Sequence, residues 1–495
     1  MSKQSFRNLI VYEIYPTSFF DGNNDGIGDL KGITSKLEYI ADLGFNAIWF
    51  NPFYVSPFLD GGYDVEDFFD VDPRFGNMGD FNRVVKKAHK LGIKVILDLV
   101  AGHSSFTNPA FLKSAQADRN EYSDLFIWND NPWDKEGGLI SGLFNRHGCY
   151  MVNFFAHQPA FNYGFKQIDH PSWQMSYQDK RTYVAREYIL NVMRFWLDKG
   201  ADGFRVDMAD SLVKNDEDKS ATIEVWNYLF RKIRKQYPKA FFVSEWSYPE
   251  RSFKAGFDAD FVLDHWDNFY HRMFRSDDST RGTSIINGEG DISFTLKDMK
   301  ERFRQAEIHK SYLALISGNH DSWRIANYLD HEQLKMFYMF LLCMPGIPFV
   351  LYGDEIEMKT SDLPSKDGGY QRTGTRIPMI WNDSKPYHGF TKADEPYLPF
   401  SDENTVSVKT AIKDKDSIYN FIKELISLRK RIKDLSDPHV EIKEKDRVFS
   451  FQRGNYTLIL NMSAKEHAFK GNVIISTLPF TGKLPAGCGV LIKDN

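Results

Sequence analysis

The chain has 495 residues and a formal net charge of −5, with 42% apolar and 26% charged residues. This length exceeds one small domain, and this composition is typical of a globular protein with a large core. The slightly acidic charge gives no reason to expect nucleic acid or an anionic membrane surface as a partner.

The cysteines and the apolar segments indicate in which cellular compartment the protein works. Cys149, Cys343 and Cys488 are far apart and show neither metal-ligand spacing nor a disulfide framework. Residues 1–10 are polar and lack the apolar region of a signal peptide. The longest apolar run, residues 337–352, is interrupted by prolines and a glycine, which is unfavourable for a membrane span. We therefore predict a cytoplasmic protein without a membrane anchor.

The first expected strand, Leu9–Tyr15, precedes an acidic loop of sequence DGNNDGIGD at residues 21–29. Oxygen-bearing side chains alternate along this loop, as in calcium-binding loops. Position twelve is Gly32 instead of Glu, so the loop is not a complete EF-hand. The alternative is a solvated turn. We expect a structural Ca²⁺ bound by the side chains of Asp21, Asn23, Asp25 and Asp29 and the carbonyl of Ile27.

Helices and strands then alternate. Helices are expected at Leu30–Leu43 and 79–91, and strands at Ala47–Phe50 and Lys94–Val100. A glycine-rich turn between them carries Asp60 and Tyr63, while Asp98 and His103 lie at the end of the later strand. Residues 104–170 are polar and aromatic-rich without clear amphipathic helices, and an insertion of this length is usually functional.

A helix expected at Thr182–Lys199 leads into a short apolar strand that carries Arg205 and Asp207. Side chains at positions i and i+2 of a strand point the same way, so these two residues share a face. An arginine beside a carboxylate keeps its pKa low, and a carboxylate nucleophile must be ionised. For an isolated motif of this kind, a structural ion pair is the alternative.

The alternation continues to about residue 432. Further strands are expected at Ala240–Val243, Phe261–Leu263, Tyr312–Ile316 and Ile347–Tyr352, and further helices at 219–236, 296–307, 331–343 and Ser417–Ile432. Glu245, Asp264 and the run Asn319-His320-Asp321 follow three of these strands. Eight strand–helix units predict a closed, parallel (β/α)8 TIM barrel.

Three domains are expected. The barrel (domain A) comprises residues 1–103 and 171–435, and residues 104–170 form a domain B inserted after strand 3. From about Pro438 the apolar period changes to two, which predicts a C-terminal antiparallel β-domain, a β-sandwich domain C over residues 436–495.

Polar side chains gather just after the predicted barrel strands, at Asp98, His103, Arg205, Asp207, Glu245, His320 and Asp321. The active sites of such barrels lie at this end of the strands, and mutually repelling carboxylates cluster for chemistry or cation binding. Retaining glycoside hydrolysis needs two carboxylates about 5 Å apart, one as nucleophile and one as acid. Asp207 suits the nucleophile, and Glu245 suits the acid because an indole such as Trp246 would raise its pKa.

Segments 44–52, 98–103, 203–207, 319–321 and 346–355, with Glu245, resemble the sequence regions of the α-amylase family (glycoside hydrolase family 13) in order and spacing. The resemblance implies a barrel with an inserted domain and a C-terminal β-domain. It also implies that Asp207 is the nucleophile, Glu245 the acid/base and Asp321 the transition-state stabiliser, with Tyr63 as the platform for the sugar.

Within that family the chain most resembles oligo-1,6-glucosidases, α-glucosidases and trehalose synthases, whose calcium loop resembles residues 21–29. Asp60 together with Arg376 resembles the pair that grips the terminal glucose and makes such enzymes exo-acting. A structural ion pair is the alternative. The expected substrate-binding residues are Asp60, Tyr63, Asp98, His103, Arg205, His320 and Arg376.

Some positions depart from this subgroup. Ala160 replaces an Asp, Met208 follows the nucleophile, and Ile377 and Ile380 replace Thr and Gln. These changes leave linkage and acceptor preference open.

The predicted function is a retaining exo-acting α-glucosidase that acts on short α-glucan oligosaccharides or disaccharides, without an organic cofactor, as a monomer or homodimer. A trehalose synthase-like isomerase or another glucosyltransferase is an alternative, as is an endo-acting α-amylase if Asp60 and Arg376 do not meet. A catalytically inactive binding or transporter-accessory protein is disfavoured because all three carboxylates are present.

Overall fold

A computed structural model describes residues 6–129, 131–133, 138–141, 144–263, 268–275, 284–366, 368, 372–401, 405–479 and 482–494. Asp264, expected at the end of a barrel strand, lies outside these residues.

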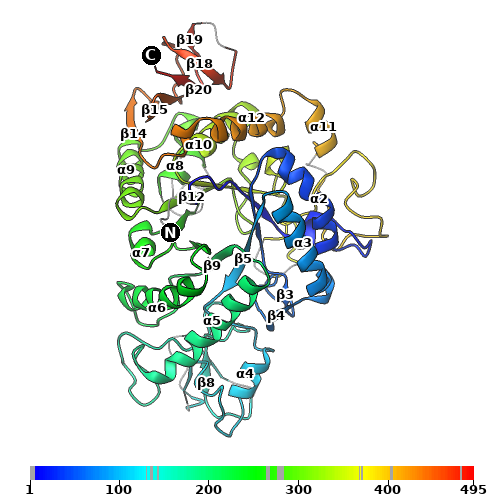
Figure 1. Ribbon diagram of the computed structural model, residues 1–495, viewed down its shortest axis with the longest axis vertical. Helices are drawn as coiled ribbons and strands as arrows, with labels where there is room; N and C mark the ends of the chain where they lie inside the picture. Colours follow the sequence, from blue (N-terminus) through cyan, green and yellow to red (C-terminus); the bar gives the residue numbers. More distant parts are fainter. Residues whose placement is uncertain are drawn as a thin grey trace.

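Eight parallel strands close into a barrel in the order β1-β13-β12-β11-β10-β9-β5-β2 (Figure 1). In chain order they are β1 Val11–Ile14, β2 Ala47–Phe50, β5 Lys94–Val100, β9 Gly203–Asp207, β10 Phe241–Ser244, β11 Ala259–Val262, β12 Tyr312–Ile316 and β13 Ile347–Leu351. These strands are apolar almost throughout because helices cover the outer face and side chains fill the interior. The predicted (β/α)8 barrel is confirmed.

Long helices lie between the barrel strands, and shorter ones occur in the connections. The long helices are α2 Leu30–Leu43, α3 Met78–Lys90, α5 Tyr183–Asp198, α6 Ser220–Gln236, α9 Ile292–His309, α10 His331–Cys343 and α12 Ile418–Arg431. The short ones are α1 Pro16–Phe19, α4 Pro109–Ser114, α7 Pro249–Lys254, α8 Phe269–Phe274 and α11 Val408–Lys413. Local signals set their ends, as in α3, where Asn77 and Asp80 form a capping box. No described helix has the length and hydropathy that a membrane crossing requires.

The chain leaves the barrel after β5, its third strand, for a long excursion. This excursion contains α4 and a small antiparallel sheet of β6 Trp128–Asn129, β7 Leu139–Ser141 and β8 Cys149–Met151. It returns to the barrel end through an isolated bridge between His103 and Ala160. Another two-stranded sheet, β3 Tyr54–Val55 and β4 Asp67–Val71, follows β2. The excursion therefore lies at the barrel end that carries the polar side chains.

The C-terminal part is a five-stranded antiparallel sheet in the order β14-β15-β16-β20-β18, with a two-stranded sheet of β17 and β19 beside it. The strands are β14 Glu441–Lys445, β15 Val448–Arg453, β16 Tyr456–Asn461, β17 His467–Ala468, β18 Asn472–Ser476, β19 Lys483–Leu484 and β20 Cys488–Lys493. The sheet packs on α10, where the rings of Phe340 and Phe451 have centroids 5.4 Å apart. It lies at the top of Figure 1, whereas α4 and β8 lie at the bottom.

Aromatic rings fill the barrel interior below the polar end. Ring centroids are 5.5 Å apart for Trp49 and Phe261 and 4.9 Å apart for Phe261 and Phe349. The indole N–H of Trp49 donates to Asp98 Oδ2 at 3.2 Å. The apolar interior of the barrel thus ends at the hydrogen bond between Trp49 and Asp98.

Candidate active site

Arg205 is the centre of a cluster of three carboxylates. Its Nη1 lies 2.9 Å from Asp98 Oδ1 and 3.0 Å from Asp207 Oδ1, and its Nη2 lies 2.7 Å from Glu245 Oε1. Asp98 and Arg205 are register partners on β5 and β9, and Glu245 directly follows β10. The barrel therefore brings together four residues that the sequence places at the ends of three strands.

The charges of this cluster do not balance. Arg205 is 1% exposed, so one buried guanidinium faces three carboxylates. Burial raises the pKa of Asp207 well above its ordinary value although Arg205 opposes this, and burial raises the pKa of Asp98 to about 6. The expectation that Arg205 keeps the pKa of Asp207 low is therefore corrected, since burial and the neighbouring carboxylates outweigh one guanidinium. The cluster retains a proton more readily than separate carboxyl groups would.

Glu245 is held from two sides. Besides Arg205, the backbone N–H of Met208 donates to Glu245 Oε2 at 3.0 Å. Met208 has a φ of 40°, a left-handed conformation that residues with long side chains rarely adopt. The indole of Trp246, for which the sequence predicts a contact with Glu245, packs edge-on against Phe257 with ring centroids 6.5 Å apart.

Asp321 lies in a strongly positive environment. Its Oδ1 accepts hydrogen bonds from Arg376 Nη2 at 2.8 Å and Arg372 Nη1 at 3.0 Å, and its Oδ2 lies 3.2 Å from His320 Nε2. Although burial opposes it, the contact with His320 and the charges of Arg372 and Arg376 hold the pKa of Asp321 well below its ordinary value. Asp321 is thus an ionised carboxylate that can only accept hydrogen bonds.

The arginine near Asp60 corrects one prediction. Arg372 Nη1 lies 3.7 Å from Asp60 Oδ1, whereas Arg376 binds Asp321 and donates from Nε to the carbonyl of His320 at 3.1 Å. Arg376 is fully buried, while the Arg372 side chain is 20% exposed. The pair is therefore Asp60 and Arg372, and two arginines four residues apart in one loop could not be distinguished from the sequence.

Asp60 is itself buried, and it links distant segments. Gln158, from the excursion after β5, donates to Asp60 Oδ2 at 2.8 Å. Burial raises the pKa of Asp60 to about 6, against the opposing effect of Arg372 and Arg376. Its Oδ1 is buried and receives no hydrogen bond from the described residues. A sugar hydroxyl could supply the missing donor.

Tyr63 lies between the two groups of charges. Its hydroxyl donates to Asp98 Oδ2 at 2.9 Å, and its ring stacks on His320 with centroids 5.3 Å apart and an interplanar angle of 6°. Both oxygens of Asp98 are thus used within the protein, by Arg205, Tyr63 and Trp49. Asp98 therefore supports the positions of these three side chains.

His103 is also engaged within the protein. Its Nε2 donates to the carbonyl of Tyr63 at 3.1 Å, and its Nδ1 lies 3.2 Å from Asn153 Nδ2. Burial lowers the pKa of His103 to about 3, so the imidazole is neutral. The N–H that the sequence assigns to a sugar hydroxyl is used here to fix the Tyr63 turn.

Sequence reasoning missed other residues of the site. Arg372 and Asn153 carried no motif signal, and Asn51 was not singled out within the segment 44–52. Glu13 carried a signal, because a charged residue in the middle of the buried strand sequence VYEI is unusual. Its Oε1 lies 2.9 Å from His320 Nδ1.

The predicted calcium loop is tightly folded. Asp21 accepts hydrogen bonds from the backbone N–H of Gly26 at 2.8 Å and the hydroxyl of Thr391 at 2.5 Å. Asp29 is the N-cap of α2 and accepts from Gly32 N at 2.6 Å. Asp25 accepts from Ile27 N at 2.9 Å. A carboxylate has about four acceptor positions. Asp21 uses all of them, since it also accepts from Asn23 N at 3.1 Å and Asn24 N at 2.6 Å, whereas Asp25 accepts two hydrogen bonds and keeps capacity for a cation.

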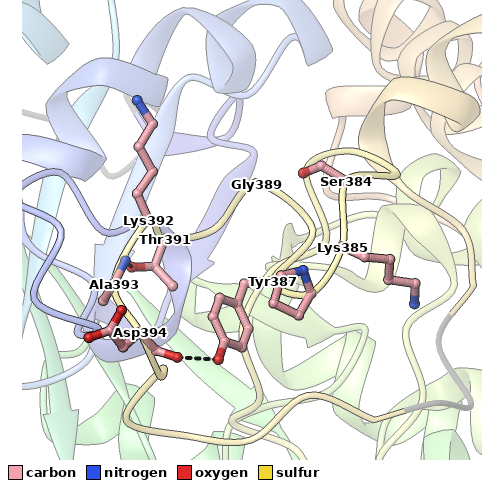
Figure 2. Close-up of a pocket in the computed structure, with 9 residues that line it drawn as sticks. Ser384, Lys385, Tyr387, Gly389, Thr391, Lys392, Ala393 and Asp394 are labelled. Carbon is pink, nitrogen blue, oxygen red and sulfur yellow. Dashed lines mark hydrogen bonds between the residues drawn. The ribbon is translucent and has the colours of Figure 1, made fainter.

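A surface hollow of about 400 Å³ lies next to this loop, lined by residues 384–387, 389 and 391–394. In Figure 2 the side chains of Lys385 and Lys392 point away from one another, and the Tyr387 hydroxyl bonds to the carbonyl of Asp394. None of the carboxylates around Arg205 lines this hollow.

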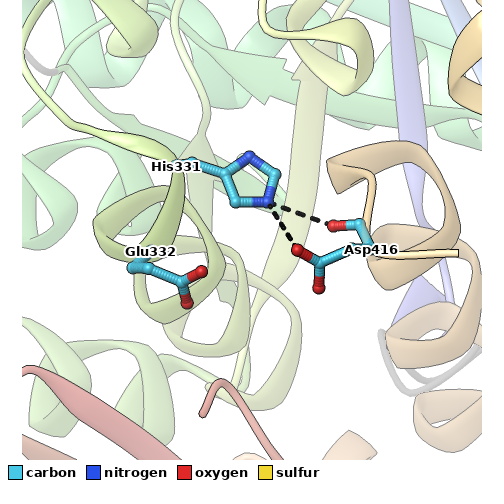
Figure 3. Close-up of side chains that lie close together, drawn as sticks. All are labelled: His331, Glu332 and Asp416. Carbon is cyan, nitrogen blue, oxygen red and sulfur yellow. Dashed lines mark hydrogen bonds and ion pairs between the residues drawn. The ribbon is translucent and has the colours of Figure 1, made fainter. Parts of the chain in front are cut away.

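His331, Glu332 and Asp416 bring their ligand atoms within 4.8 Å of one another (Figure 3). However, Lys335 Nζ lies 2.8 Å from Asp416 Oδ1 and 3.3 Å from Glu332 Oε1. The ammonium group already supplies the positive charge that these carboxylates attract, so this cluster is not assigned to a metal.

Known proteins resemble this chain in sequence and in fold. The α-amylase catalytic domain model matches residues 13–437. The chain is 30% identical to α-amylase 3 of Dictyoglomus thermophilum, over 89% of this chain and 81% of that protein. It is 29% identical to an oligo-1,6-glucosidase of Parageobacillus thermoglucosidasius, over 87% and 84% respectively. The structure of trehalose-6-phosphate hydrolase from Bacillus licheniformis superposes with a TM-score of 0.80 at 23% identity, covering 98% of this chain and 99% of that one, and this supports the fold.

The family model spans most of the chain, and the relatives are matched over most of their length. The barrel carries the buried carboxylates at its carboxyl end, where enzymes of this fold react. The chain belongs to the α-amylase family, glycoside hydrolase family 13, and is a glycosidase.

Proposed function

We propose that the enzyme is a retaining, exo-acting α-glucosidase that releases glucose from the non-reducing end of short α-linked oligosaccharides. The arrangement of Asp60, Arg372 and Asp321 carries this proposal. Charged donors and acceptors converge there on a small space, as recognition of the hydroxyls of one terminal sugar requires. Asp60 and Arg376 do not meet, but Arg372 takes the expected place beside Asp60, so we favour an exo-acting enzyme over an endo-acting one, which would need that end of the site to be open.

In the proposed reaction, Asp207 attacks the anomeric carbon while Glu245 gives its proton to the leaving oxygen. The glycosidic bond breaks and a covalent glucosyl ester forms on Asp207. Glu245 then removes a proton from water, whose oxygen displaces Asp207 and releases glucose with retained configuration. Arg205 holds the two carboxylates on different nitrogen atoms, which supports a fixed separation between them.

The proposed reaction requires one proton on Glu245 and none on Asp207 or Asp98, so the proton that burial favours on Asp207 has to lie on Glu245 when the sugar binds. Together with Arg205 this leaves one net negative charge, which favours the positive charge that develops on the sugar ring. Asp321, ionised and held by two arginines, would bind hydroxyls as the ring distorts.

The early products from maltotetraose test the proposal. We expect glucose, first as the α-anomer, together with maltotriose. Maltose as the first product would indicate an open, amylase-like site and contradict the proposal. Conversion of maltose into trehalose would instead identify an isomerase, and cleavage of isomaltose but not maltotetraose would identify an α-1,6 preference.

We also propose that the loop at residues 21–29 binds a structural Ca²⁺ through the four side chains and the carbonyl predicted above. The ion would fix the loop and the start of α2, with no part in the reaction. Metal analysis of purified enzyme should give about one Ca²⁺ per chain. A chelator should lower the melting temperature of the wild type and leave that of Asp25→Ala unchanged, and an equal chelator effect on both proteins would contradict the proposal. The predicted cytoplasmic location and the monomeric or homodimeric state stay predictions.

A further inference from the structure

Glu13 is a buried acid that the proposed reaction does not use. It lies on β1, has no exposed surface, and faces the barrel interior beneath His320. The charged groups that act on it are Arg205, Asp321 and Asp98. A carboxyl group in such a place needs a physical reason, because burial of an unpaired charge is costly.

Three polar groups meet at His320 Nδ1. Glu13 Oε1 and Asn51 Nδ2 each lie 2.9 Å from this nitrogen, and Asn51 Nδ2 lies 3.2 Å from Glu13 Oε1. An amide nitrogen only donates, so Nδ1 accepts a hydrogen bond from Asn51 and carries no proton. The Glu13 oxygen at the same distance then has to carry a proton itself.

The other Glu13 oxygen agrees with a neutral acid. Oε2 is buried and has no hydrogen-bond partner among the described residues. On an ionised carboxylate this would leave charge without compensation, whereas on a neutral carboxyl group the penalty is smaller. Burial also raises the pKa of Glu13 well above its ordinary value, with Asn51 and Arg205 opposing.

The opposite side of the imidazole faces the proposed sugar site. Nε2 lies 3.2 Å from Asp321 Oδ2 and has no hydrogen bond with good geometry among the described residues. The ring is held between Tyr63, at 5.3 Å, and Tyr15, at 6.2 Å, with interplanar angles of 6° and 14°. The ring is therefore fixed, and its Nε2 is available to a ligand beside Asp321.

We propose that Glu13 is a positioning residue that, as a neutral acid and together with the amide of Asn51, holds His320 in the tautomer with its proton on Nε2. This N–H then donates to the hydroxyl that Asp321 accepts, so that the sugar meets one donor and one acceptor. The role of the N–H rests on the proposed function, whereas the tautomer is a property of the free enzyme. Burial disfavours the cationic form of this imidazole, and Arg376, Arg205 and Arg372 disfavour it further, whereas Asp321 favours it.

Nitrogen-15 NMR of enzyme labelled at histidine tests the tautomer without substrate. His320 is assigned by the signal that disappears in His320→Gln. We expect one protonated nitrogen, Nε2, from about pH 5.5 to 8. The Glu13→Gln variant should keep this pattern, because an amide N–H replaces the acid O–H at Nδ1. A cationic His320, or a proton on Nδ1 in the wild type, would overturn the proposal.

Kinetics provide the second readout. Glu13→Gln should keep kcat/KM within about threefold and leave its pH profile unchanged, whereas Glu13→Leu should lose about tenfold or more because Nδ1 loses a donor. Equal losses in both variants would contradict the proposal. If Glu13→Leu does not fold, the tautomer in the wild type and in Glu13→Gln still decides the question. An unexpected product from maltotetraose would contradict the proposed function and leave the tautomer result intact.

Discussion

Asp98 and Arg205 are register partners on neighbouring barrel strands, and their side chains meet at 2.9 Å inside the barrel. Asp98 therefore fixes the guanidinium before any substrate arrives. The two nitrogen atoms of Arg205 are then directed at Asp207 and Glu245. The site is organised by the fold itself, which is the condition under which charged groups stabilise a transition state most effectively.

Replacing the proposed nucleophile should separate activity from stability. Asp207→Asn should lower kcat by about 10⁴-fold or more, since no covalent ester can form. Its melting temperature should be equal to or above that of the wild type, because a buried acid with a raised pKa becomes a neutral amide. Calorimetry and initial rates measure both effects.

Asp210→Asn is the matched control, because Asp210 lies in the same loop in a partly exposed ion pair with Lys219 at 3.2 Å. It should retain nearly full activity and stability. Substantial activity in Asp207→Asn would remove Asp207 from the proposed role.

The two arginines should behave differently. Arg372→Ala should lower kcat/KM for maltose by about 10- to 100-fold, because a charge-assisted contact with the sugar site is lost, with little change in melting temperature. Arg376→Ala should unfold at a clearly lower temperature, because the contacts of the fully buried Arg376 with Asp321 and with the carbonyl of His320 are lost.

Steady-state kinetics and thermal unfolding of both variants decide between these roles. A drop in melting temperature for Arg372→Ala as large as that for Arg376→Ala would show that Arg372 is mainly structural. Lys86→Ala, at an exposed lysine on α3, serves as a control for charge removal.

Asp60 should make stability fall as the pH rises. Its pKa is about 6 in the folded protein, compared with about 3.9 in an unfolded chain. A carboxyl group with a raised folded-state pKa stabilises the fold fully below about pH 4, and this contribution is lost as the pH rises through about 6.

Between about pH 4 and pH 7 the wild type should therefore lose about 2 kcal/mol of unfolding free energy relative to Asp60→Asn. Urea unfolding at several pH values measures the difference. The exposed Asp118→Asn should run parallel to the wild type, and parallel curves for Asp60→Asn would contradict the prediction.

Met208 should be sensitive to side-chain shape. Its φ of 40° is poorly tolerated by β-branched residues and well tolerated by asparagine. Met208→Val should lower the unfolding free energy by about 1–3 kcal/mol, whereas Met208→Asn should be close to the wild type. Activity should follow the same order, because this conformation directs the Met208 N–H at Glu245. Equal stability of the two variants would show that the backbone relaxes freely.

The period of the apolar residues and the polar residues that follow the predicted strands were sufficient to predict the barrel, the excursion after β5 and the C-terminal sheet. The two-residue period of a strand also placed Arg205 and Asp207 on one face, because that spacing is a local property. The roles of Asp207, Glu245 and Asp321 stay predictions until they are measured.

Contacts between residues from distant segments of the chain could not be predicted in the same way. The choice between Arg372 and Arg376 depends on how one long loop folds over the site. The pKa of Asp207 depends on burial and on two carboxylates from other strands. Glu13 was visible as a charge within an apolar strand, but its partner His320 lies 307 residues later.

The contacts of Asp60 also depend on the order in which the chain is synthesised. Asp60 is contacted by Gln158 and Arg372, which come from segments far apart in the chain. A ribosome releases the first two residues long before the third, and domains fold as their sequence emerges. The barrel's early strands can pair during translation, but the contacts around Asp60, which the proposed function assigns to a terminal sugar, are complete only after residue 372 has left the ribosome. Nascent chains that stop short of that residue would therefore carry the proposed nucleophile and acid without a place to hold the sugar.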